Sequence, residues 1–345
     1  MLSAPARPAP PSVAVPRRRP TTAFAVLLAG VLVVAAASLF LGSNPIAAGT
    51  VLHNLLDPLS DSDAIVWGSR VPRTALGLLV GGCLGIAGAV MQGQTGNPLA
   101  DPGIFGVSSG ASLAVVLGVY VLGVNSIPLT LALALAGAIV ASVVVFGVAA
   151  LGRGLASPVP LAIAGTAVSA LLGAVTSFLV LRDEESLEAY RIWVVGSLSG
   201  RTLDGVGPVL GFVAVGLACA LANVRSLNNL ALGTDMARGL GESLWRARLV
   251  GLGSITFLTA GAVALAGPIG FVGLTAPHVA RALVGGDHYR LLPASGLVGM
   301  VALLACDVVG RLIGGQAEVS VGVVLAALGG VAFVLIVRRT KLAAL

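Results

Sequence analysis

Residues 131–151 read LALALAGAIVASVVVFGVAAL, an uninterrupted apolar stretch without a charged side chain. A helix of about 20 apolar residues spans the hydrocarbon core of a bilayer, whereas the strands of a membrane barrel alternate apolar and polar residues over about ten positions. Residues 22–41 form a second continuously apolar stretch of the same kind. The pattern therefore predicts transmembrane α-helices and argues against a β-barrel.

The composition of the whole chain agrees with this prediction. The 345 residues are 57% hydrophobic and only 10% charged, whereas soluble domains carry roughly 25% charged residues. An ordinary soluble globular protein is excluded, because too few polar residues are present to cover its surface. The 47 glycines predict helices that pack closely through small residues.

We expect an all-α polytopic membrane protein with about ten transmembrane helices and both termini in the cytoplasm. Residues 1–20 predict a disordered basic tail in the cytoplasm, and residues 21–345 a transmembrane domain. The eighth span is short and contains Pro277. The expected spans are 22–41, 71–91, 103–122, 128–151, 161–181, 205–222, 245–266, 271–284, 292–312 and 319–337.

The distribution of Lys and Arg sets the orientation. With the N-terminus inside, most of the 20 basic residues fall on cytoplasmic loops and tails, as the positive-inside rule requires. A cleaved signal peptide over residues 17–42 is the alternative interpretation. We favour a membrane anchor, because the apolar run is longer than the 7 to 15 residues of a signal core.

Motifs for catalysis are weak. Gly106, Ser108 and Gly110 match the GxSxG pattern of hydrolases, but they open an apolar helix and follow no strand. The only lysine is Lys341, so the chain has no GxxxxGK[ST] phosphate-binding loop. We expect a protein that is not an enzyme, with any ATP hydrolysis in a separate subunit. A membrane-embedded hydrolase that uses Ser108 is a distant alternative.

Candidate metal or cofactor ligands are also weak, and we expect no cofactor. The cysteines Cys83, Cys219 and Cys306 each lie inside an apolar run without CxxC spacing, so we interpret them as packing residues. His278 follows Pro277 in the short eighth span and is interpreted in the same way.

Asp307 is the clearest ionisable residue inside an apolar run. It lies four residues before Arg311, so the spacing predicts an i,i+4 ion pair near the outer end of the ninth span. The alternative is a polar lining for a conduit. Because embedded carboxylates are otherwise scarce, a secondary transporter driven by protons or sodium is disfavoured but stays open.

The longest cytoplasmic connection spans residues 225–244. We expect two short helices there, the first ended by Gly233 and the second capped by the Thr234 hydroxyl. Leu232, Met236 and Leu240 would form an apolar stripe on which a soluble partner could dock. A helix lying on the lipid surface is the alternative.

Several motifs together resemble the FecCD family, the permease subunits of bacterial ABC importers for iron-siderophores, haem and cobalamin. The resemblance covers nearly everything after the basic tail. The motifs are Arg70-Val-Pro-Arg73, Gly88-Ala-Val-Met-Gln92, Asn97-Pro-Leu-Ala-Asp-Pro-Gly103, Gly106-Val-Ser-Ser-Gly-Ala111, Trp193-Val-Val-Gly-Ser-Leu198, Leu232-Gly-Thr-Asp-Met-Ala-Arg-Gly-Leu-Gly241, Gly267-Pro-Ile-Gly-Phe-Val-Gly-Leu-Thr-Ala-Pro-His-Val-Ala-Arg281 and Asp287-His-Tyr-Arg-Leu-Leu-Pro293.

The resemblance implies a multi-pass permease of the bacterial cytoplasmic (inner) membrane that carries an iron-siderophore, or alternatively cobalamin or haem. Its implied partners are a dimer of ABC ATPase subunits, an extracytoplasmic substrate-binding lipoprotein or periplasmic protein, and a second permease, either a like copy or a paralogue. No nucleic-acid partner is implied.

The resemblance also implies site residues. Arg70, Arg73 and Arg311 match arginines that dock the binding protein, with snorkelling to the membrane interface as the alternative. The residues that match the ATPase coupling segment are Leu232, Gly233, Thr234, Asp235, Met236, Ala237, Arg238, Leu240 and Gly241. The residues that match the pathway or gate are Ser157, Pro158, Val159, Ile163, Asn97 and Pro98. The match over 157–163 is loose, because prolines stand where the family has small polar residues. For Asn97 and Pro98 the alternative is a structural role, in which the turn breaks the helix and the Asn97 side chain satisfies freed backbone groups.

Overall fold

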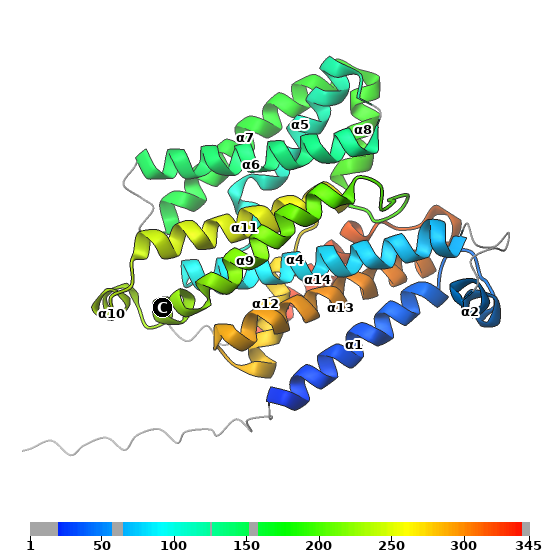
Figure 1. The fold of residues 1–345 in the computed structure, drawn as a ribbon. Helices are drawn as coiled ribbons and strands as arrows, with labels where there is room; N and C mark the ends of the chain where they lie inside the picture. The colour runs from blue at the N-terminus through cyan, green and yellow to red at the C-terminus, as the bar shows by residue number, and fades with distance from the viewer. Residues whose placement is uncertain (1–19, 57–64, 125, 152–157, 340–345) are drawn as a thin grey trace, which may run out of the picture.

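A computed structural model describes residues 20–56, 65–124, 126–151 and 158–339. Within these ranges the regular secondary structure is entirely helical (Figure 1). The helices are α1 (Pro20–Phe40), α2 (Ala48–Leu56), η1 (Val66–Arg70), α4 (Val71–Thr95), η2 (Pro102–Phe105), α5 (Val107–Leu122), α6 (Ile127–Leu151), α7 (Pro158–Val180), α8 (Glu184–Val194), α9 (Val206–Leu230), α10 (Thr234–Gly239), α11 (Leu244–Ala266), α12 (Val272–Val284), α13 (His288–Gly314), η4 (Gly315–Ala317) and α14 (Val321–Arg339).

Helices occupy all ten predicted span positions. Seven of the described helices are long and apolar enough to cross a membrane, namely α1, α4 with its η1 extension, α6, α7, α9, α11 and α13. Helices α5, α12 and α14 are shorter and lie where the third, eighth and tenth spans were predicted. The prediction of an all-α polytopic membrane protein is confirmed. The predicted tail lies almost wholly outside the described residues.

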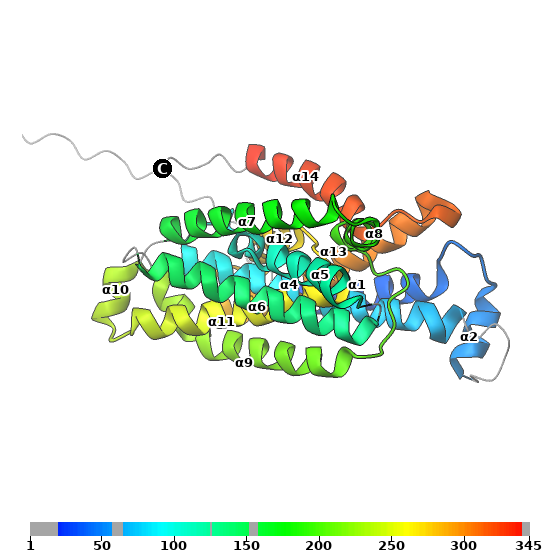
Figure 2. The ribbon, with the colours of Figure 1, turned by 90° about the horizontal axis from the view of Figure 1, so that it is seen from above.

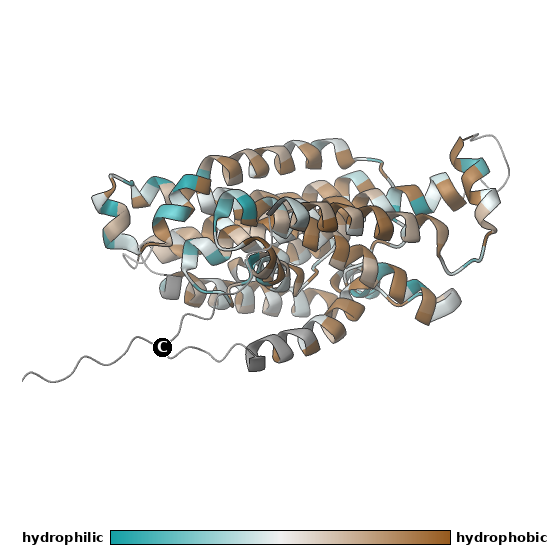
Figure 3. Ribbon diagram, turned by 90° about the horizontal axis from the view of Figure 1, so that it is seen from below, coloured by the Kyte–Doolittle hydropathy of each residue, from teal (hydrophilic) through white to brown (hydrophobic). Residues whose placement is uncertain are grey.

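The long helices run side by side, so the bundle has two distinct ends (Figure 2). We call them the α10 end and the α2 end, after the short helix that lies at each. Apolar residues dominate the middle of the bundle, and hydrophilic residues gather toward its ends (Figure 3). This distribution is what a membrane-spanning bundle requires, because the hydrocarbon core cannot solvate polar groups.

Glycines bring the central helices α4 and α13 into backbone contact. A Cβ atom on Gly81 would lie 2.5 Å from the carbonyl oxygen of Gly299, and one on Gly85 would collide with the carbonyl of Ser295. Only residues without a side chain permit this approach, as is common in membrane helix packing. The prediction of close packing through small residues is confirmed at this contact.

The short helices α2 and α8 were not predicted as elements. Both lie outside the continuously apolar stretches, and a search for membrane spans detects only such stretches. The Asp183 carboxylate caps the start of α8 by accepting a hydrogen bond of 2.8 Å from the Ser186 amide, which is the preferred role of Asp at this position. Hydrogen bonding to the side chain and the backbone amide of Ser186 lowers the pKa of Asp183.

Two details of the expected 225–244 connection are wrong. Helix α9 continues without a break to Leu230, so no separate first short helix exists. Gly233 is the residue that precedes α10, and the cap has no side-chain hydrogen bond from Thr234. Helix α9 extends past residue 222, where the predicted span ends, because Val224 and Leu227 still pack against the bundle and are buried.

Candidate docking and coupling sites

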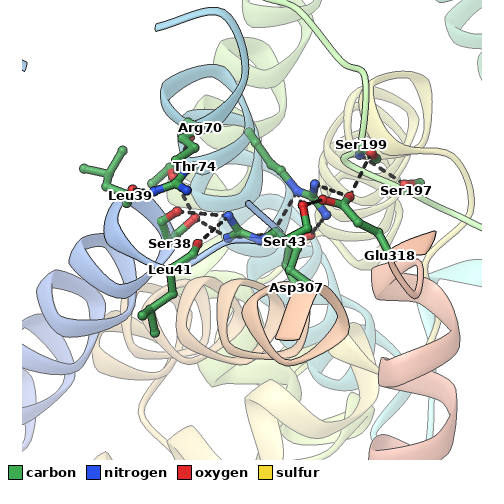
Figure 4. Close-up of polar contacts among 12 residues, drawn as sticks. Ser38, Leu39, Leu41, Ser43, Arg70, Thr74, Ser197, Ser199, Asp307 and Glu318 are labelled. Carbon is green, nitrogen blue, oxygen red and sulfur yellow. Dashed lines mark hydrogen bonds and ion pairs between the residues drawn. The ribbon is translucent and has the colours of Figure 1, made fainter. Parts of the chain in front are cut away.

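A buried carboxylate organises the α2 end of the bundle (Figure 4). Asp307 of α13 is completely buried. The Nε atom of Arg73 donates to both Asp307 carboxylate oxygens at 3.0 Å, and a terminal nitrogen donates to Oδ1 at 2.8 Å. Arg311 approaches Oδ2 of the same carboxylate at 3.0 Å. The predicted Asp307–Arg311 pair is therefore confirmed, and Arg73 is a second partner.

Two of the arginines also cap the end of α1. Arg311 donates at 3.0 Å to the carbonyls of Ser38 and Leu41, and Arg70 donates at 2.8 Å to the carbonyl of Leu39. The last carbonyls of a helix lack intrahelical partners and carry partial negative charge, so guanidinium groups stabilise them. The cluster thereby joins α1 to α4 and α13.

Glu318 completes the cluster from the connection between α13 and α14. It accepts hydrogen bonds from Arg73 at 2.7 Å, Ser43 at 2.8 Å and Ser199 at 3.0 Å. Burial alone would raise the pKa of Glu318, but these hydrogen bonds outweigh it and lower the pKa below the usual value of 4.5. The carboxylate is therefore ionised at neutral pH.

The three predicted docking arginines are brought together, but their guanidinium groups are not on the surface. Arg70 and Arg73 are each 4% exposed and Arg311 is 2% exposed. Each guanidinium group is hydrogen-bonded inside the bundle. Together they line a pocket of about 270 Å³ whose wall also includes Ser69 and Glu318. The docking role itself stays a prediction.

The segment predicted to couple to an ATPase forms the short helix α10 at the opposite end of the bundle (Figures 1 and 2). Leu232, Met236 and Leu240 are 63%, 60% and 58% exposed, so the predicted apolar stripe faces outward. Ala237 is completely buried and anchors the helix. Asp235 and Arg238 form an exposed i,i+3 pair at 3.2 Å.

The predicted gate residues lie in different structural settings. Ser157 lies outside the described residues, and Pro158 and Val159 begin α7. Ile163 is 63% exposed on α7. Asn97 and Pro98 lie in the turn after α4, where the Asn97 carboxamide oxygen accepts a hydrogen bond of 2.9 Å from the Leu99 amide. Their pathway role stays a prediction.

The structure offers little support for the weaker chemical motifs. Ser108 lies in the first turn of α5, and no strand precedes it in the described part of the chain. The described residues hold no group of three or more His, Cys, Asp or Glu side chains that could bind a metal ion. Cys83 is buried, and Cys219 and Cys306 are partly buried, as expected of packing residues.

Sequence reasoning missed the part of the cluster that comes from distant segments. Ser38 and Glu318 are separated from their arginine partners by more than 240 residues. No spacing rule connects them. The only signal was that the predicted orientation puts Arg70, Arg73 and Arg311 on the outer side of the membrane, where the positive-inside rule places basic residues least often.

Comparison with known proteins places these features in one family. The family model of the FecCD transport family matches residues 28–339. The chain is 44% identical to the ferric enterobactin transport system permease protein FepD of Escherichia coli, over 92% of this chain and 96% of FepD. It is 40% identical to the cobalamin import system permease protein BtuC of Halobacterium salinarum, over 82% and 76% of the two chains.

A solved structure shares the fold. It is an inward-facing conformation of a metal-chelate type ABC transporter, with a TM-score of 0.77 and 28% identity. The match covers 93% of this chain and all of the other. The family model and these full-length matches together show that the chain belongs to the FecCD transport family.

Proposed function

We propose that this chain is the permease subunit of an ABC importer that moves an iron-siderophore across the bacterial cytoplasmic membrane. The observation that carries the proposal is the 44% identity to a ferric enterobactin permease over almost the full length of both chains. The absence of a phosphate-binding lysine from the sequence agrees with a separate ATPase.

The α2 end is the proposed docking surface for a substrate-binding protein. Three arginines line its pocket against two carboxylates, Asp307 and Glu318. One positive charge is left unbalanced, which favours an acidic side chain from a partner. Because the guanidinium groups are buried and capped internally, the arginines would act mainly through the shape and charge of the pocket.

The α10 end is the proposed site of ATPase coupling. The exposed stripe of Leu232, Met236 and Leu240 offers an apolar contact for a soluble subunit. Helix α10 is held to the bundle by Ala237, and Glu242 just beyond it is bonded to α9. A displacement of α10 would therefore be transmitted to α9 and α11.

The proposed pathway runs between two permease subunits along α7. Ile163, Leu171, Val175 and Phe178 are exposed at helical spacing on this helix. Such a stripe can face lipid, a second permease or a weakly polar conduit. A like copy and a paralogous permease would each satisfy it, and the gate residues would lie near its start.

The test is uptake of a radiolabelled ferric siderophore by bacterial cells with and without the gene, both energised and depleted of ATP. Loss of uptake on deletion, only where ATP is present, is the expected result. Uptake that survives ATP depletion would instead indicate the ion-coupled alternative and overturn the mechanism.

Cobalamin is the second candidate cargo, because the 40% identity to a cobalamin permease is nearly as high. The same cells distinguish the two cargoes when labelled cobalamin is supplied. Loss of cobalamin uptake alone would keep the ABC mechanism and change the cargo. Labelled haem completes the comparison, since a hemin transport permease of Yersinia pestis is 34% identical.

A further inference from the structure

A polar cleft opens between α9 and α11 at the α10 end, beside the proposed coupling segment. Its volume is about 430 Å³. One wall is the polar end of α9, the opposite wall is the start of α11, and the linker from Leu240 to Ser243 closes a third side. The cleft shares Leu240 and Gly241 with the proposed coupling segment, and its other lining residues are not assigned to docking, coupling or the pathway.

The cleft carries a net positive charge. Arg225 and Arg246 line it from its two walls, and both are exposed. Neither forms a salt bridge with a carboxylate within the part of the chain that the structure describes. Glu242 is the one acidic residue of the lining, and hydrogen bonds from Ser226 and Asn229 keep it ionised with a lowered pKa. Two arginines against one carboxylate favour an anionic occupant.

The position of the cleft points to a lipid. Helix α9 changes there from its apolar part, which ends at Ala222, to a polar end that begins at Asn223. Trp245 is 55% exposed at the start of α11, and exposed Trp residues gather at the boundary between headgroups and hydrocarbon. Leu221 and Leu249 are 70% and 46% exposed beside the cleft, where acyl chains would pass.

We propose that this cleft binds the phosphodiester of an anionic phospholipid, with Arg225 and Arg246 on the phosphate. Basic pockets between transmembrane helices on the cytoplasmic side are a recognised mode of lipid headgroup binding. The inference depends on the membrane-spanning fold and goes beyond the proposed transport function, because it holds for any cargo.

The bound headgroup would stabilise the coupling segment. The linker from Leu240 to Ser243 forms part of the cleft wall and leads directly from α10 to α11. A lipid held between the two arginines therefore bridges α9 and α11 beneath α10. Anionic lipid would then limit how far α10 moves relative to the bundle.

The experiment measures lipid binding to the purified full-length permease by native mass spectrometry. Dioleoyl-phosphatidylglycerol, dioleoyl-phosphatidylcholine and inorganic phosphate are the three probes. Phosphatidylglycerol is expected to bind most tightly, and Arg225→Gln and Arg246→Gln are each expected to weaken it about fivefold. Arg290→Gln removes an exposed arginine of α13 that does not line the cleft, and it is expected to leave the affinity unchanged.

Four results would overturn the proposal. Equal affinity for the two lipids would remove the role of charge, and an unchanged affinity in a variant that combines Arg225→Gln with Arg246→Gln would place the lipid elsewhere. Inorganic phosphate that binds as tightly as the lipid would show a simple anion site.

Photoactivatable phosphatidylglycerol provides a test without variants when it is applied to the wild-type permease alone and to the wild-type ABC complex. Adducts concentrated on residues 221–250 in both samples support the site. Adducts that form there on the permease alone and are lost in the complex would assign the cleft to the ATPase instead.

Discussion

Arg73 of α4 and Asp307 of α13 are 234 residues apart in the sequence and form three hydrogen bonds of 2.8–3.0 Å inside the bundle. The side chains are 5% and 0% exposed. Because Asp307 also pairs with Arg311, one carboxylate faces two guanidinium groups. The removal of the Asp307 charge therefore leaves Arg311 without its carboxylate partner and Arg73 with Glu318 alone.

We predict that Asp307→Asn destabilises the permease by about 3–5 kcal/mol, the usual cost of breaking a buried ion pair on one side. Thermal unfolding of the purified protein in detergent measures the effect. Asp204→Asn is the matched control, because Asp204 is exposed at the start of α9 and forms no salt bridge among the described residues. Equal melting temperatures for the two variants would contradict the prediction.

Gly85→Ala is predicted to destabilise the bundle by about 1–3 kcal/mol, the range found for overpacked cores. The added methyl group would collide with the backbone carbonyl of Ser295 on α13, so the two helices must separate. Gly253→Ala on α11 is the control, since a Cβ at that position meets no atom within 4 Å. Thermal unfolding again measures the stability of both variants. A loss of stability in Gly253→Ala but not in Gly85→Ala would refute the prediction.

Met236→Ser and Leu240→Ser are predicted to reduce ATP-dependent uptake strongly without unfolding the permease. Both side chains are exposed, Met236 on α10 and Leu240 directly after it, so their loss removes partner contact and little internal packing. Co-purification of the ATPase with the permease gives the direct measurement. Leu203→Ser is the control, because Leu203 is 49% exposed in the connection that precedes α9. Undiminished co-purification of the ATPase with both stripe variants would exclude this contact.

Ser69→Asp is predicted to weaken docking of the substrate-binding protein about fivefold. This factor corresponds to about 1 kcal/mol, the upper range for one exposed charge interaction. Ser69 is exposed and lines the arginine pocket, and the new carboxylate would cancel its excess positive charge. Ser126→Asp makes the same change just before α6, outside the pocket lining. Surface plasmon resonance with the purified binding protein measures both, and equal affinities would count against docking there.

The pH dependence of stability follows from Glu318. Its pKa is lowered in the folded protein, so its ionised form stabilises the fold above the unfolded pKa. This contribution is present at neutral pH and is lost as the pH falls below about 4.5 through the lowered folded pKa. Glu318→Gln is predicted to be less stable at pH 7 and to lose less stability on acidification. Parallel acid profiles for the variant and wild type would contradict this assignment.

The local sequence predicts the spans well because the bilayer imposes a simple requirement. Each span must be apolar along its length and satisfy its own backbone hydrogen bonds, so helices such as α6 follow directly from composition. The short α12 was also expected, since Pro277 lies inside it. Helices α2 and α8 were missed because a helix outside the hydrocarbon needs no continuous apolar run.

The sequence by itself determined that the chain crosses the membrane repeatedly as helices, that Asp307 and Arg311 share one helical face, and that an apolar stripe follows α9. These properties depend on hydrophobicity and on residues within one or two helical turns. Only the tertiary structure decided that Arg73 and Glu318 join Asp307 in one buried cluster, and that Arg225 and Arg246 line the same cleft. Partners such as Arg73 and Asp307 are brought together by the packing of helices through glycine, and no local pattern encodes which distant helix that packing selects.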